Sequence, residues 1–149
     1  MQIKHLKLNN FCGFFGSKTF DHDFFEKTEI TGANEAGKST VKKAIFWIFN
    51  CRDENGKEIS GIRPHDENGN DINDLEVSAE LTVDVDGTVK ILKKVSRQNL
   101  NKKGEFTGNV IDYYINDIPK KASDYSEYIS SFAEEYVPYC MNAMTLLLK

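Results

Sequence analysis

The residues with the clearest chemistry form a short glycine-containing segment near the start of the chain. Gly32 and Gly37 are separated by four residues, and Lys38 and Ser39 follow directly, which matches the phosphate-binding pattern G-x-x-x-x-G-K-S/T. An apolar stretch with strand character precedes the segment, and a strongly apolar stretch with helix character follows it. The spacing therefore predicts an anion-binding loop at the N-terminus of a helix.

Each residue type in this loop has an expected role. Side chains at the two glycines would keep the backbone from wrapping phosphates, while the amides from Asn34 to Thr40 are expected to point inward at the positive end of the helix dipole. Lys38 is expected to bridge the β- and γ-phosphates, Ser39 to bind Mg²⁺, and Thr40 to contact the α-phosphate. The predicted binding residues are Gly32, Ala33, Asn34, Glu35, Ala36, Gly37, Lys38, Ser39 and Thr40, with Ser39 as metal ligand and no catalytic residue assigned.

The surrounding sequence predicts a mixed α/β fold. Strands are expected near Ile3–Leu8, at Lys18–Phe24 and, just before the loop, at Thr28–Thr31. A helix from Lys38 to about Phe49 has almost no polar face and should be buried on most sides. The stretch from Asn50 to Asp74 is rich in Gly, Asn, Asp and Pro, which predicts a long surface loop.

The clearest strand runs from Leu75 to Asp84, where apolar and polar residues alternate without exception and so predict one buried face and one solvated face. A second strand follows. A three-residue turn starting at Val85 is expected, because it pairs Val83 with Val89 on the apolar face, whereas a two-residue turn would place Lys90 there.

Further elements are a strand at Gly108–Asn116 and a helix at Ser123–Phe132, with Ser123 as a plausible cap.

Small GTPases and nucleotide kinases continue after their phosphate loop with parallel strands and crossover helices. Here a long loop and antiparallel strands follow instead, which disfavours both of those classes.

Composition limits the function further. The chain has 149 residues, 40% of them hydrophobic, which is the size of one domain. With 19 basic and 23 acidic residues the net charge is -4, so there is no general attraction to nucleic acid or anionic lipid, and any DNA contact must be local. Three scattered cysteines, no signal peptide and no membrane-length apolar run favour the cytoplasm, with no membrane partner.

Three stretches carry a family resemblance: the opening MQIKHLKLNNFCGFFGSKTF, the segment ITGANEAGKST and the later YYINDIPKKASDYSEYI. Together they resemble the N-terminal half of the ATPase head in SMC-like, RecF-like and SbcC-like ABC-type ATPases, the DNA repair and chromosome-organising machines. The resemblance spans most of the chain and is strongest in the loop, where it implies that Asn34 reads the γ-phosphate. These openings commonly read Asn-Phe-Arg-Gly, whereas this chain has Cys12 in place of the arginine, so no arginine contact is assigned there.

The resemblance implies a P-loop NTPase fold of ABC-head type, with an antiparallel β-meander beside the Walker A strand, loop and helix. It also implies ATP and Mg²⁺ as cofactors, a head-to-head homodimer on ATP binding, DNA as partner of the full-length assembly and a nuclease subunit as a further partner.

Two parts of such a head are not found in the sequence. No run of four apolar residues followed by Asp-Glu is present to serve as Walker B, and no LSGGQ-like signature occurs. In the family these parts lie downstream of a long coiled coil. Residues 1–149 are therefore expected to form the N-terminal lobe of a head, either as a fragment or as half of a split head. ATP hydrolysis is expected of the full-length protein and hardly at all of this segment.

Two other stretches were weighed. Six basic residues and no acid lie between Lys90 and Lys103. They could track a DNA backbone, but their mixed parity favours a solvated strand and loop. Asp66 begins a stretch similar to a calcium loop, which lacks the required glycine at Asp71 and glutamate at Val77.

Three functions remain open from the sequence. The first is an ABC-type head that couples ATP binding and hydrolysis to DNA repair or processing. The second is a P-loop enzyme acting on a small phosphoacceptor, and the third is a non-catalytic nucleotide-binding interaction module. Phe11, Phe14 and Phe15 could line an adenine pocket or belong to the core, and both assignments stay open.

Overall fold

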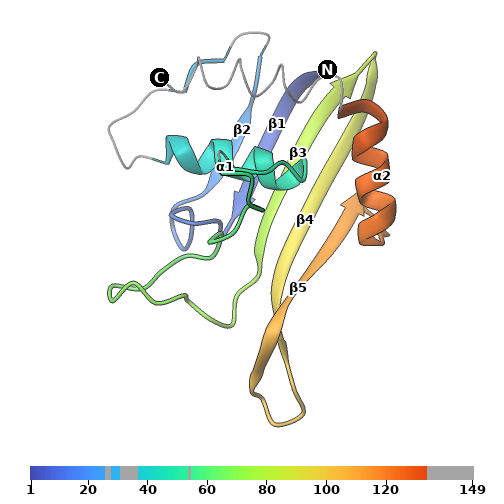
Figure 1. Ribbon diagram of the computed structural model, residues 1–149. Coiled ribbons are helices and arrows are strands. Elements are labelled where there is room, and N and C mark those ends of the chain that lie inside the picture. Colours follow the sequence, from blue (N-terminus) through green and yellow to red (C-terminus); the bar gives the residue numbers. More distant parts are fainter. Residues whose placement is uncertain (26–27, 31–36, 54, 134–149) are drawn as a thin grey trace.

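The computed structural model describes residues 1–25, 28–30, 37–53 and 55–133. Within these ranges six strands form one antiparallel sheet in the order β2-β1-β3-β4-β5-β6, and two helices cover one of its faces (Figure 1). The predicted α/β fold with an antiparallel sheet is confirmed. The elements are β1 (Gln2–Asn9), β2 (Phe20–Asp23), α1 (Lys38–Ile48), β3 (Val77–Val85), β4 (Thr88–Leu100), β5 (Phe106–Ile115), β6 (Ile118–Lys120) and α2 (Ala122–Ala133).

The core lies between the sheet and the two helices. The alternating residues of β3 are fully buried, as their pattern predicts, and α1 packs across them. Each fully buried Val or Leu side chain contributes about 1.5–3 kcal/mol relative to an exposed one, so β3 and α1 together anchor the fold. The buried residues of α1 are Val41, Ala44, Ile45, Phe46, Trp47 and Ile48.

The β3–β4 hairpin differs from the sequence prediction. Val83 pairs with Lys90, so the loop contains only Asp86 and Gly87. Both loop residues have positive φ, 52° and 84°, as a two-residue type I′ turn requires. The predicted three-residue turn that begins at Val85 is therefore wrong.

Lysine chemistry explains the error. The prediction assumed that Lys90 must avoid the apolar face, but a lysine can lay its stem along apolar surface and keep its ammonium paired. Here the Lys90 ammonium donates to the Tyr128 hydroxyl at 2.7 Å and lies 4.7 Å from the centre of the Tyr128 ring. Val89 takes the opposite face and is 56% exposed.

Three smaller predictions have different outcomes. Residues 28–30 are not in a strand, so the short strand expected before the loop is wrong over that stretch, and Thr31 lies outside the described residues. Helix α2 begins at Ala122, which places Ser123 inside the helix rather than at its cap. The predicted loop between α1 and β3 is confirmed, since its described residues form no helix and only isolated bridges.

The loop at Asp66 shows why its sequence is similar to a calcium site. One Asp66 carboxylate oxygen accepts hydrogen bonds from the amides of Asn68 and Asn70, at 2.8 and 2.9 Å. These bonds lower the pKa of Asp66, with the Asn70 amide as the largest cause. The carboxylate is thus a turn-forming group, and no cluster of metal-binding side chains occurs among the described residues.

Candidate nucleotide-binding site

The N-terminus of α1 is set by Gly37, which has a left-handed backbone with φ 97°. A Cβ atom at this position would lie 2.5 Å from Cζ of Phe14, much closer than any real contact. Glycine is therefore required twice, once by the backbone conformation and once by the aromatic ring that packs against it. The sequence analysis expected glycine here for another reason, namely that a side chain would keep the backbone from wrapping phosphates.

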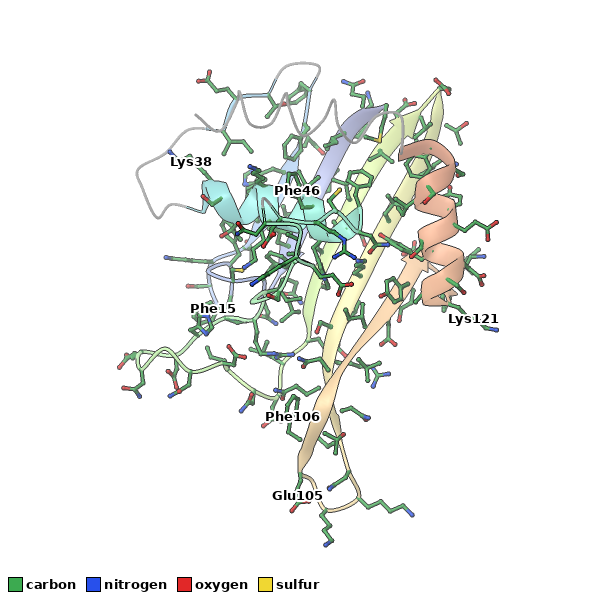
Figure 2. All side chains as sticks on the ribbon, viewed as in Figure 1. Phe15, Lys38, Phe46, Glu105, Phe106 and Lys121 are labelled. Carbon is green, nitrogen blue, oxygen red and sulfur yellow. The ribbon has the colours of Figure 1, made fainter. Side chains whose placement is uncertain are left out.

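The first turn of α1 has the chemistry of an anion site. It contains no acidic residue, and no side chain of the described residues caps it. Helix geometry leaves the first amide groups without an intrahelical acceptor, and the helix dipole adds positive potential there. Lys38 lies in this turn, at the end of α1 farthest from α2 (Figure 2), where a lysine is unfavourable for the helix unless an anion is present.

Four of the predicted site residues are described, and they lie together. Gly37, Lys38, Ser39 and Thr40 form the first turn of α1 and the residue before it. The other five, Gly32, Ala33, Asn34, Glu35 and Ala36, lie outside the described residues. Convergence of their amides on a phosphate therefore stays a prediction.

A cavity of about 390 Å³ lies beside the first half of α1. Ser39, Lys42 and Lys43 line it from the helix, and Asp53 and Glu58 line it from the loop that follows. Ser39 is exposed, and it lines this space together with two acidic residues, whose side chains are of the oxygen-donor type that Mg²⁺ prefers.

The three aromatic residues that follow β1 separate into different roles. Phe11 is fully buried and packs on Trp47, with ring centroids 5.7 Å apart, so it belongs to the core. Phe14 packs against Gly37 and against Phe20, whereas Phe15 is exposed. The Phe14 ring therefore helps to position the start of α1 through its contact with Gly37.

Cys12, which stands where the resemblance leads one to expect arginine, is half-buried in the turn after β1. Its amide donates to the carbonyl of Ile62 at 2.8 Å. Burial raises the pKa of the Cys12 thiol, with the charge of Lys43 acting in the opposite direction. This cysteine fastens the turn to the loop after α1 and supplies no positive charge.

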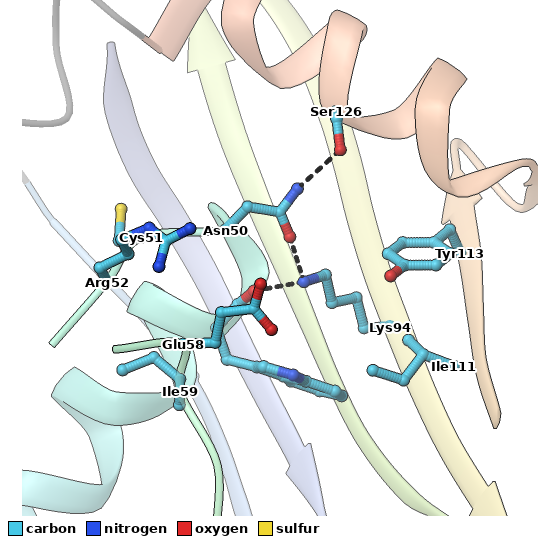
Figure 3. Close-up of a pocket in the computed structure, with 10 residues that line it drawn as sticks. Asn50, Cys51, Arg52, Glu58, Ile59, Lys94, Ile111, Tyr113 and Ser126 are labelled. Atoms are coloured by element: carbon cyan, nitrogen blue, oxygen red, sulfur yellow. Dashed lines mark hydrogen bonds between the residues drawn. The ribbon is translucent and has the colours of Figure 1, made fainter. Parts of the chain in front are cut away.

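A buried lysine of β4, which the sequence analysis did not identify as a functional residue, lies at the C-terminal end of α1. Lys94 of β4 is only 3% exposed, and its ammonium donates to the carbonyl of Trp47 and to the side-chain oxygen of Asn50 (Figure 3). The rings of Trp47, Tyr113 and Tyr125 surround the ammonium at 5.2–5.6 Å, the range of cation–π attraction.

Burial lowers the pKa of Lys94 to about 8, and the charges of Cys51 and Glu58 oppose that shift. These two residues line a cavity of about 290 Å³ next to the lysine (Figure 3). The Tyr125 hydroxyl of α2 donates to the carbonyl of Ile48 at 2.7 Å. The last carbonyls of α1 are therefore held from both β4 and α2.

The signal for Lys94 was present in the sequence but is ambiguous. Lys90 and Lys94 both face the helices, so the predicted solvated strand and loop is wrong at Lys94, which is buried. Sequence alone does not distinguish a buried lysine from a solvated one, because the distinction depends on acceptors supplied by α1.

Comparisons with known proteins show the family and the fold of the chain. A family model described as an AAA domain matches residues 5–141. One similar solved structure, from work on the structural biochemistry of ATP-driven dimerization and DNA-stimulated activation of SMC ATPases, has a TM-score of 0.58 at 16% identity, covering 88% of this chain and 79% of that one. The SMC head domain from Thermotoga maritima has a TM-score of 0.54 at 25% identity, covering 86% of this chain and 42% of that one.

No curated protein sequence matches the chain significantly. Among the described residues, no helix has the length and apolar character needed to span a membrane. Because the matched family model covers nearly the whole chain and the fold matches SMC heads, the chain belongs to the AAA domain family and has the fold of an SMC-like ABC-type ATPase head.

Proposed function

We propose that the chain is the ATP-binding N-terminal lobe of an ABC-type ATPase head. The observation that carries the proposal is the first turn of α1, where Gly37, Lys38 and Ser39 begin a helix that has no acidic residue and is capped by no described side chain. The chain covers 42% of the Thermotoga SMC head domain and 79% of the other similar structure; the assignment as one lobe of a head rests on the first of these.

The residues present fit a nucleotide with magnesium. Gly37 to Thr40 would hold the phosphates through backbone amides, and Lys38 would neutralise the β- and γ-phosphates. Ser39 would provide a hydroxyl ligand to Mg²⁺, which when bound supplies charge neutralisation at the terminal phosphates. Asn34 would contact the γ-phosphate.

The wider function follows from the same family. In the full-length assembly, ATP binding would close two heads on each other, and hydrolysis would be coupled to DNA repair or processing in the cytoplasm, with a nuclease subunit as a further partner. ATP-driven dimerization and DNA-stimulated activation are stated for the SMC ATPases of the similar structure, and this supports both the dimer and the DNA partner.

A nucleotide titration tests the site. A fluorescent ATP analogue with Mg²⁺ is expected to bind the wild-type chain, and Lys38→Ala to bind at least about tenfold more weakly, because a charge-assisted hydrogen bond is lost. Lys121→Ala is the matched control: it removes one exposed lysine at the other end of the molecule (Figure 2) and should leave affinity unchanged. Equal affinity in wild type and Lys38→Ala, with both folded by circular dichroism, would refute the proposal.

The magnesium assignment has its own test. Removing Mg²⁺ is expected to weaken ATP binding to the wild type, and Ser39→Ala should reduce this magnesium dependence while retaining metal-free binding. A Ser39→Ala variant with unchanged magnesium dependence would remove Ser39 from the metal site without affecting the nucleotide assignment.

A further inference from the structure

The cavity of about 290 Å³ at the C-terminal end of α1 has the size and the lining of a small-molecule site (Figure 3). Its walls come from α1, the loop after it, β4, β5 and α2. The volume is close to the ~300 Å³ at which pockets for small molecules begin. Such pockets combine apolar walls with a few charged groups, and both kinds of group are present here.

The Lys94 ammonium brings a buried positive charge to this cavity. Its hydrogen-bond acceptors, the Trp47 carbonyl and the Asn50 side-chain oxygen, are both neutral and use two of its three N–H donors. None of the ion pairs between described residues includes Lys94. A buried ammonium costs free energy unless an anion compensates its charge, and this cost is why burial lowers the pKa of Lys94. An anion in the adjacent cavity would supply the compensation.

Arg52 adds a second positive charge to the lining. The side chain is exposed, and its Nη1 atom donates to the carbonyl of Gly56 at 3.0 Å. This bond lies within the turn that follows α1, so it holds the guanidinium without neutralising it. Arg52 and Lys94 line one cavity from two different elements, the loop after α1 and β4, which suits a ligand that carries its negative charge at one end.

Two features oppose an anion in the cavity. Glu58 is the single acid among the described lining residues, so the lining still has one more positive than negative charge. The negative end of the α1 dipole is also close, but the carbonyls of Trp47 and Ile48 accept hydrogen bonds from Lys94 and Tyr125. The balance of charge in the cavity therefore favours an anion.

The apolar part of the lining distinguishes between classes of anion. Ile59, Ile111 and the rings of Trp47 and Tyr113 form much of the wall. An inorganic oxyanion would pair with the two cations and leave this apolar surface in water. An organic acid would cover the same surface with its own apolar body, which is favourable in proportion to the area removed from water.

We propose that this cavity binds a small organic carboxylate, with the carboxylate between Lys94 and Arg52 and the apolar body against Ile59 and Ile111. The cavity lies at the opposite end of α1 from Lys38, and the proposal is independent of the proposed nucleotide-binding function. A bound acid would place an anion beside the ammonium that holds the last turn of α1.

Tryptophan fluorescence gives a local readout of binding. Trp47 is the only tryptophan of the chain and lines the cavity. Cyclohexanecarboxylate, which does not absorb where tryptophan does, is expected to change the Trp47 emission saturably. The neutral cyclohexanecarboxamide has nearly the same shape and should bind at least about tenfold more weakly, because charged acceptors form the stronger hydrogen bonds with ammonium and guanidinium groups.

Charge variants test the lining while keeping the fold. Arg52→Gln should weaken carboxylate binding about two- to fivefold, the range of an exposed ion pair, and Glu58→Gln should strengthen it because a competing negative charge is removed. Lys57→Gln is the matched control, since Lys57 is an exposed cation of the same loop outside the lining, and it should leave binding unchanged. Lys94→Met should abolish the saturable response while circular dichroism shows a folded chain.

Several results would overturn the proposal. They are equal affinity for the carboxylate and the carboxamide, equal effects of Arg52→Gln and Lys57→Gln, or unchanged or weaker binding in Glu58→Gln. Inorganic phosphate is tested in the Lys38→Ala variant, so that the candidate nucleotide site does not contribute. Phosphate binding as tight as that of cyclohexanecarboxylate would replace the organic acid by an inorganic oxyanion. The carboxylate response should persist in Lys38→Ala, so failure of the nucleotide site and failure of this cavity are distinguishable.

Discussion

The ammonium of Lys94 donates a hydrogen bond of 2.6 Å to the carbonyl of Trp47, near the C-terminus of the helix that begins with Lys38. The positive charge thus lies at the negative end of the helix dipole. Because α1 is a single rigid element of 11 residues, the groups that hold its last turn also fix the position of its first turn. Lys94 and Tyr125 therefore support the candidate nucleotide site from its far end.

Replacing Lys94 with methionine tests this support. Lys94→Met keeps the apolar stem but leaves the acceptor of Asn50 without its donor, so the free energy of unfolding at pH 7 should fall by about 1–3 kcal/mol. The control is Lys93→Met, which replaces a half-exposed lysine on the opposite face of the sheet. It should change the free energy of unfolding by no more than about 0.5 kcal/mol. Urea denaturation measures both, and equal effects would remove the special role of Lys94.

The lowered pKa of Lys94 predicts a pH dependence. Its folded-state pKa of about 8 lies below its ordinary value of 10.5, so between these pH values the unfolded chain binds the proton more than the folded chain does. The free energy of unfolding should therefore rise with pH across this window. The gap between wild type and Lys94→Met should widen as pH increases from about 7 to about 9.5.

Other titrating groups around Lys94 limit the window. Burial raises the pKa of Tyr113 and of Tyr125, so above about pH 10 the unfolded chain loses phenol protons that the folded chain keeps, and the free energy of unfolding falls. Cys51 and Glu58 also face the lysine and are present in both proteins. A gap that stays constant from about pH 7 to about pH 9.5 would contradict the assignment to Lys94.

The short edge strand β2 is joined to β1 by His5. Its two ring nitrogens lie 2.6 Å from a carboxylate oxygen of Asp21 and 2.7 Å from one of Asp23. The hydrogen bond to Asp23 is the largest cause of a raised His5 pKa, with burial opposing and Asp21 contributing further.

Because the folded-state pKa exceeds the ordinary value of 6.5, the stabilisation by His5 is complete below about pH 6.5 and lost as pH rises through the raised value. His5→Asn should therefore lower the melting temperature at about pH 5.5 and have a smaller effect at about pH 8.5. In the Asp21→Asn/Asp23→Asn background this pH-dependent difference should vanish, and its persistence there would assign it to another group.

Gly37 should not tolerate a side chain. Gly37→Ala forces a Cβ against Phe14 in a left-handed conformation, so a loss of about 1–3 kcal/mol in unfolding free energy is expected. Adding Phe14→Ala should not restore stability fully, because the backbone strain remains. Gly13→Ala is the control, since Gly13 has no positive φ and its Cβ would meet nothing within 4 Å. Urea denaturation measures all three variants, and equal losses in Gly37→Ala and Gly13→Ala would contradict the special requirement at Gly37.

The sequence by itself determined the elements whose pattern is local. The alternation in β3, the apolar composition of α1 and the Gly37-Lys38-Ser39 order each predict their structure from neighbouring residues, and the loop pattern further predicts phosphate chemistry. Backbone periodicity and a helix N-terminus are properties of short segments, so no long-range information was needed.

Only the tertiary structure decided the roles of Lys90, Lys94 and Phe14. A lysine is buried where another element supplies acceptors and aromatic rings, and here α1 and α2 supply them. The burial of Lys90 against α2 also explains the register of the β3–β4 hairpin, in which Lys90 pairs with Val83. Strand parity alone predicted this register wrongly. Phe14 limits Gly37 because the turn after β1 folds against the start of α1, and such pairings depend on how distant segments meet, which residue type alone does not determine.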